Sequence, residues 1–105
     1  MNYYPKLKLL IDKIDELLKT PDLTADTKEF VDWQIRTELF LSRCYGSQSI
    51  ELERFQKVAF SAPNRNGTTE DAIRQCKSGL YEARNTFEIY LEELADENYE
   101  KGVDS

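Results

Sequence analysis

Carboxylates near the carboxyl end are the residues of this chain with the most obvious chemical potential. The stretch "YLEELADENYE" contains Glu92, Glu93, Asp96 and Glu97. Acid–base work of the glycosidase kind needs two carboxyl groups held across a cleft in different environments, whereas these acids follow one another along one helix end. We therefore expect a solvated acidic surface that contacts a partner, and no metal site, with weak binding of a divalent cation as the alternative.

The residue types that most other enzymes and metal sites need are missing. The chain has 105 residues and no histidine, which removes the commonest general base and the commonest zinc ligand. It has no cysteine–histidine metal spacing, no glycine-rich phosphate loop and no serine with a histidine to activate it. The sequence thus predicts a protein that is not an enzyme, with no catalytic residue and no cofactor.

The two cysteines, Cys44 and Cys76, both fall on apolar faces of predicted helices. Because the chain shows no secretion signal, we expect reduced thiols that pack as small apolar residues, with a disulfide as the alternative. The amino end, "MNYYPKLKLLIDKIDELL", is interrupted by Lys, Asp and Glu, which argues against a signal peptide and a membrane span. These features predict a cytoplasmic protein.

Charge disfavours a nucleic-acid partner. The formal net charge is -6 and the sequence pI is about 4.7, so phosphate backbones are repelled at long range. The local exception is the loop that contains Asn64, Arg65 and Asn66, an irregular segment of the kind where binding residues concentrate. We expect this loop to contact a protein partner, and weak binding of an anion or nucleic acid near Arg65 is the alternative.

The elements that position these groups are predicted to be four helices, three long and one short. The first covers residues 5–19, with Pro5 in its first turn and an end at Thr20-Pro21, because the residue before proline is pushed out of the helical conformation. Its apolar residues recur at steps of three and four, as they do on one helix face. They are Leu7, Leu10, Ile11, Ile14, Leu17 and Leu18.

The second helix is predicted to begin at "DTKE", where Asp26 and Glu29 have the spacing of a capping box. It carries two apolar faces, so we expect it to touch partners on both and to be the central helix of the domain. A polar strip separates them, with Asp32 and Arg36 as an i,i+4 ion pair. The first face is Phe30, Trp33, Thr37, Phe40, Leu41 and Cys44, the second is Val31, Ile35 and Leu39, and the strip is Glu29, Asp32, Arg36 and Arg43.

Gly46 is placed to end the second helix, and Ser47 or Ser49 to cap a short third helix over residues 49–59. This helix offers apolar residues for burial, and the loop "FSAPNRNGTTED" follows it. The residues offered are Ile50, Leu52, Phe55 and Val58.

The fourth helix is predicted from Thr69 to about Glu97, with a heptad seam of apolar residues. Gly79 inside it costs about 1 kcal/mol relative to alanine, which the close approach of another helix would explain. The seam packs against the first two long helices, or its late part meets the same seam of a second chain. The seam is Ile73, Cys76, Leu80, Ala83, Phe87, Tyr90 and Leu94, and the interface residues would be Phe87, Tyr90, Leu91 and Leu94.

A pattern across the chain resembles a known kind of helical segment. The pattern "F..W..RT..FL...YG..S.....F..VAF" over residues 30–60, followed by "GL..A...F" over residues 79–87, is similar to the helical segment that precedes TIR-like or other predicted nucleotide-binding effector domains in bacterial defence-type proteins. The resemblance covers roughly residues 5–95. It implies an accessory module that assembles or regulates an effector and has no catalysis of its own.

Together these observations predict one all-α domain over residues 1–105, ordered over about 5–97, with a frayed acidic tail over 98–105. The expected function is protein–protein interaction, as an accessory or oligomerisation module with a protein partner or a second copy as a homodimer. The first alternative is an acidic inhibitor, encoded by a phage or mobile element, that binds a host protein. The second alternative is the anion or nucleic-acid binding near Arg65.

Overall fold

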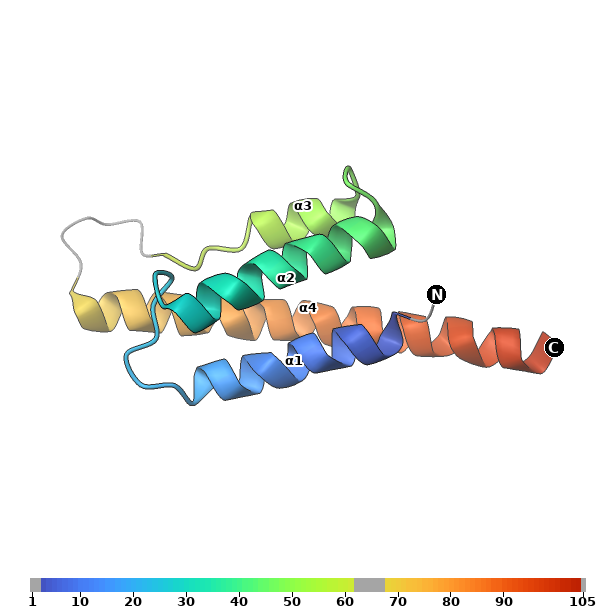
Figure 1. Cartoon of the computed structure of the whole chain (residues 1–105), viewed down its shortest axis with the longest axis horizontal. Coiled ribbons are helices and arrows are strands. Elements are labelled where there is room, and N and C mark those ends of the chain that lie inside the picture. Colours follow the sequence, from blue (N-terminus) through green and yellow to red (C-terminus); the bar gives the residue numbers. More distant parts are fainter. Residues whose placement is uncertain (1–2, 62–67, 105) are drawn as a thin grey trace.

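The computed structural model consists of four helices, and it contains no strand in the part of the chain that it describes (Figure 1). It describes residues 3–61 and 68–104, without the side chains of 97–104. The predicted loop residues Asn64, Arg65 and Asn66 lie outside the described residues. The all-α prediction, with three long helices and one short one, is confirmed. The helices are α1 (Tyr4–Leu18), α2 (Lys28–Tyr45), α3 (Ile50–Gln56) and α4 (Thr69–Asp104).

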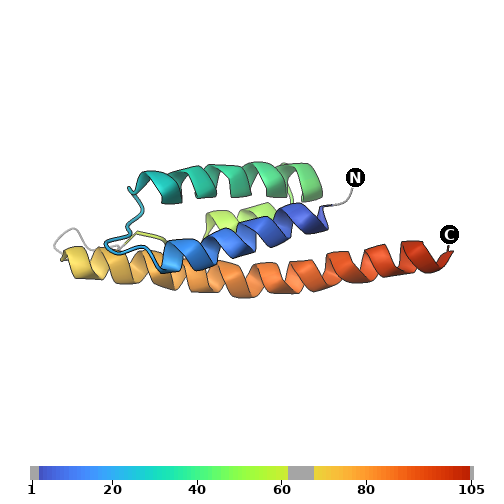
Figure 2. The same ribbon diagram turned by 60° about the horizontal axis from the view of Figure 1, so that its bottom comes forward.

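The most extensive helix–helix contact joins the first and last helices of the chain. Helix α1 lies along α4 and also contacts α2, while α2 packs on α3. The principal extents are 57 × 28 × 19 Å, and the long dimension is that of α4, whose carboxyl-terminal turns project past the other helices (Figures 1 and 2). We expected this helix to end near residue 97, but it continues to Asp104 because neither proline nor glycine occurs in it after Gly79 until Gly102.

Aromatic rings form the centre of the core. The Trp33 ring of α2 lies 5.7 Å from Phe55 of α3, and Phe55 in turn lies 5.7 Å from Phe87 of α4, measured between ring centroids. The predicted apolar faces of α1 and α4 close this core from the other side. Their fully or nearly fully buried members are Leu7, Ile11, Ile14, Leu17, Cys76, Leu80, Ala83 and Phe87.

The second apolar face of α2 is not buried, and this prediction was wrong. Val31 is half-buried, but 53% of Ile35 and 51% of Leu39 are exposed. Helix α2 packs on α3 and α1 along one side and occupies a corner of the bundle, so nothing in the described chain covers its outer side. The first face is confirmed as core, with Cys44 half-buried at its end.

The local signals that end and start helices were partly right. Gly46 adopts a φ of 109° after α2, and the Ser49 hydroxyl accepts a hydrogen bond from the Leu52 amide at 3.2 Å, so both predictions are confirmed. The prediction of a capping box at Asp26 and Glu29 was wrong. Helix α2 begins one residue later than such a box requires, with Thr27 as the N-cap, and the Thr27 hydroxyl instead accepts a bond from the Thr24 amide at 3.0 Å.

Gly79 is in close contact with another segment, as its position inside α4 suggested. The neighbour is not a helix but the chain at Ala59 and Phe60, which crosses α4 after the end of α3. The side-chain amide of Gln75 holds this crossing in place by donating to the Ala59 carbonyl at 2.8 Å.

The two cysteines pack in or beside the core, as their apolar helix faces predicted, and they are not joined in a disulfide. Cys76 is fully buried, and its burial raises the pKa of the thiol to about 11. None of the described helices has the length and hydropathy that a membrane span requires.

Candidate functional site

A groove of about 880 Å³ lies between α1 and α2. Trp33 and Phe40 of α2 form part of its floor, and both are almost completely buried. Two hydrogen bonds tie the walls together: the Trp33 indole donates to the Leu10 carbonyl at 3.1 Å, and the Tyr3 hydroxyl donates to the Arg43 carbonyl at 3.3 Å. The Tyr3 ring also meets Phe40 edge to face, with 5.8 Å between centroids. The groove is therefore built on fixed aromatic side chains.

Exposed aliphatic side chains flank this floor. Leu9 of α1 is 68% exposed and Leu39 of α2 is 51% exposed, and both line the groove. Ile35 lies one turn before Leu39 on α2 and is exposed to a similar extent. Apolar side chains that cluster on a surface, in contrast to scattered ones, are typical of interaction sites. The groove thus offers apolar contact area that no described segment of the chain covers.

Cations outnumber carboxylates along the groove. The predicted pair of Asp32 with Arg36 was wrong, because Asp32 accepts a hydrogen bond from Lys28 at 2.8 Å. This bond and the charge of Lys28 lower the pKa of the Asp32 carboxyl, and Arg36 adds a smaller contribution. Arg36 itself forms no ion pair with any described residue. The lining contains the cations Lys6, Lys13, Arg36 and Arg43 and the carboxylates Glu29 and Asp32.

The side chains of this groove can bind but are not arranged for covalent chemistry. Its ionisable groups lie at the surface, and none of the lining residues is a nucleophile beside a base. Within residues 3–61 and 68–96, no cluster of three metal-ligating side chains occurs. What remains is apolar area with cationic hydrogen-bond donors around it.

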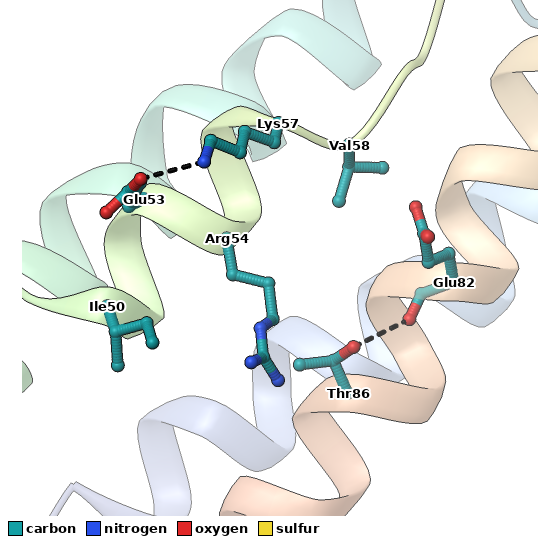
Figure 3. Close-up of a pocket in the computed structure, with 7 residues that line it drawn as sticks. All are labelled: Ile50, Glu53, Arg54, Lys57, Val58, Glu82 and Thr86. Atoms are coloured by element: carbon teal, nitrogen blue, oxygen red, sulfur yellow. Dashed lines mark hydrogen bonds and ion pairs between the residues drawn. The ribbon is translucent and has the colours of Figure 1, made fainter.

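A second, smaller cleft of about 340 Å³ lies between α3 and α4 (Figure 3). Arg54 extends into it from α3, while Lys57 pairs with Glu53 at 2.8 Å and the Thr86 hydroxyl donates to the Glu82 carbonyl at 3.1 Å. Two cations thus face two carboxylates in this cleft, so it has no net charge. Ile50, expected to be buried, lines the cleft and is 63% exposed because α3 turns this side away from the core.

The predicted interface on late α4 divides into two parts. Phe87 is 1% exposed and packs against Phe55 in its own core, so the prediction that it meets a second chain was wrong. Tyr90 is half-buried against Tyr45, with 5.5 Å between ring centroids, and burial raises the pKa of its hydroxyl. Leu91 and Leu94 are also half-buried at the core edge, and a contact with another chain remains a prediction for these three.

The predicted acidic surface lies near the carboxyl end of α4. Glu92, Glu93 and Asp96 are exposed there, and the side chain of Glu97 lies outside the described part. Residues 88–105 contain seven carboxylates and one lysine, so they carry the whole net charge of -6, and residues 1–87 contain thirteen side chains of each sign. The chain is therefore a neutral body with one strongly acidic helix end.

Sequence reasoning missed the groove. Arg36 and Arg43 were assigned to a polar strip and Leu39 to the core, although seven residues separate the two arginines and place them on the same side of the helix. Leu39 lies between these two arginines in the sequence, and this pattern was the signal that could have indicated an exposed apolar groove with cations around it. Comparisons with known protein families, with curated protein sequences and with solved structures found no match.

Proposed function

We propose that this chain is a non-enzymatic protein-interaction module that binds an acidic amphipathic helix in the groove between α1 and α2. One observation carries the proposal: the groove combines exposed leucines, a fixed aromatic floor and an excess of cations in a chain that is acidic as a whole. An amphipathic helix that enters such a groove covers the leucines with its apolar face.

Charge favours an acidic occupant over a basic or neutral one. Lys6, Arg36 and Arg43 line the groove and form no ion pair with another described residue, so they are available to carboxylates of a partner. Complementary charge mainly raises the rate of association and the selectivity between partners, and contributes less to affinity. The binding energy comes from the apolar area that is buried. An accessory role, as the resemblance to segments beside bacterial effector domains implies, requires this kind of binding.

Trp33 provides the test, because it is the single tryptophan of the chain and lies in the groove floor. We expect its fluorescence to change on titration with a synthetic acidic amphipathic helical peptide, and not with the same peptide in which lysines replace the acids. Arg36→Glu should weaken this binding at least tenfold. Arg74→Glu is the matched control, because it makes the same charge change in the first part of α4, where Arg74 contacts Asp71. Equal affinities of the two variants would contradict the proposal.

A second candidate function follows from the acidic end of α4. An inhibitor that covers a basic surface of a host protein would use Glu92, Glu93 and Asp96, which are exposed near the carboxyl end of α4. Replacing these three by their amides should then abolish binding to that host protein, whereas Arg36→Glu should leave it unchanged. Binding that survives loss of the acids would reject this mechanism.

A further inference from the structure

The groove and the acidic helix end fit each other, and they belong to the same chain. On the basis of the proposed function, we infer that the occupant of the groove is the carboxyl-terminal part of α4 from a second copy. Two copies that exchange these ends form a closed dimer in which both grooves are filled. An interface of this kind uses the same two patches on both subunits, as twofold symmetry requires.

The first argument is access. The last turns of α4 extend beyond α1, α2 and α3, so another molecule can approach them from all sides (Figures 1 and 2). At the start of this end, Ile89 is 58% exposed and lies one turn before the exposed acids Glu92 and Glu93, while Leu91 and Leu94 are half-buried at the core edge. This end therefore has the amphipathic character that the groove selects.

The second argument is charge, and it decides between two ways of pairing. If two copies paired along the same α4 seam, two segments of charge -6 would lie side by side and repel each other. Docking the same segment in the groove instead brings Glu92, Glu93 and Asp96 toward Arg36 and Arg43. Because residues 1–87 are neutral, the rest of the body adds no net repulsion. The seam-to-seam dimer expected from the heptads is thus the less favourable arrangement.

The third argument is the apolar surface left on the monomer. Leu9, Ile35 and Leu39 are all more than half exposed on one side of the molecule, and no described segment of the same chain covers them. The α4 end cannot reach its own groove while it remains a straight helix that points away from the bundle. Covering these residues therefore requires a second molecule.

A charge exchange tests the arrangement with the full chain. The groove variant carries Arg36→Glu and Arg43→Glu, and the end variant carries Glu92→Lys and Glu93→Lys. We expect sedimentation equilibrium to show a dimer for the unchanged protein, monomers for each variant alone, and a restored dimer when the two variants are mixed. The mixture restores both contacts, because each variant then meets a partner of opposite charge. Arg74→Glu should leave the dimer unchanged.

The outcomes separate this inference from the proposed function. A chain that stays monomeric up to about 1 mM, where even weak specific complexes are populated, but whose Trp33 fluorescence still responds to the acidic peptide, would overturn the dimer and leave the binding module intact. A dimer that persists in either variant, or fails to return on mixing, would also overturn it. A chain that neither dimerises nor responds to the peptide would refute both.

Discussion

Replacing Gly79 by alanine is the sharpest test of how the segment after α3 crosses α4. A Cβ atom at this position would lie 2.6 Å from Cδ1 of Phe60 and 2.8 Å from the Ala59 carbonyl oxygen. Both distances are shorter than van der Waals contact, so the ring and the backbone would have to move. Neither moves freely, because Gln75 donates to the same carbonyl and the Phe60 ring packs 4.9 Å from that of Phe30.

The expected change in the free energy of unfolding is the sum of one stabilising and two destabilising contributions. Alanine in place of an interior helical glycine stabilises a helix by about 1 kcal/mol. Overpacking of a close contact costs about 1–3 kcal/mol, and loss of the Gln75 hydrogen bond costs about 1 kcal/mol more. We therefore expect Gly79→Ala to lower the free energy of unfolding by about 2 kcal/mol, the opposite sign to that of a solvent-exposed glycine in a helix.

Urea denaturation followed by Trp33 fluorescence measures this change, because the Trp33 ring lies 6.1 Å from Phe60 and reports the integrity of the crossing. Ser78→Ala is the control at the neighbouring exposed position, where the higher helix propensity of alanine should stabilise by about 0.5 kcal/mol. If Gly79→Ala stabilised the protein as Ser78→Ala does, residues 59 and 60 could not cross α4 at this point and the reasoning would be refuted.

Three further predictions follow from single side chains. Leu80→Glu should unfold the protein, because Leu80 is fully buried. Leu94→Glu, in contrast, should leave the far-ultraviolet circular dichroism unchanged and abolish only self-association. Loss of helicity in Leu94→Glu would contradict the interface role of Leu94. Ser49→Ala should lower the free energy of unfolding in urea by about 1 kcal/mol, because the Leu52 amide loses its acceptor, and an unchanged value would show that this cap does not stabilise α3. Burial raises the pKa of the Cys76 thiol from 9.0 to about 11. As the pH rises, the thiol therefore ionises in the unfolded chain before it ionises in the folded protein. Its contribution to the free energy of unfolding should fall by about 2 kcal/mol between these two pH values. Cys76→Ala should remove most of the fall between pH 9.0 and 10.0, below the range in which Tyr45 and Tyr90, whose pKa values burial also raises, begin to contribute. An unchanged fall in that range would contradict the assignment to Cys76.

Much of the fold was predictable because it depends on spacing within one helix. The residues Cys76, Leu80, Ala83 and Phe87 recur at steps of three and four, and such residues share one face whatever packs on it. Ser49 could be assigned as a cap because its hydroxyl bonds an amide only three residues away. The candidate site was less predictable, since Asp32 lies four residues after Lys28 and four before Arg36, and spacing alone cannot choose between the two partners.

The amino-acid sequence by itself thus determined the number and type of the helices, their apolar faces and the concentration of acid at the end of α4, because these depend on near neighbours in the chain. Only the tertiary structure decided which faces are covered. Whether Leu39 is buried or exposed depends on where α1 and α3 lie relative to α2. That placement results from contacts between helices, in which Trp33 of α2 packs on Phe55 of α3 and donates a hydrogen bond to the Leu10 carbonyl of α1. The groove exists because residues distant in sequence, such as Leu9 and Leu39, line one surface, and no periodicity within a single helix contains that information.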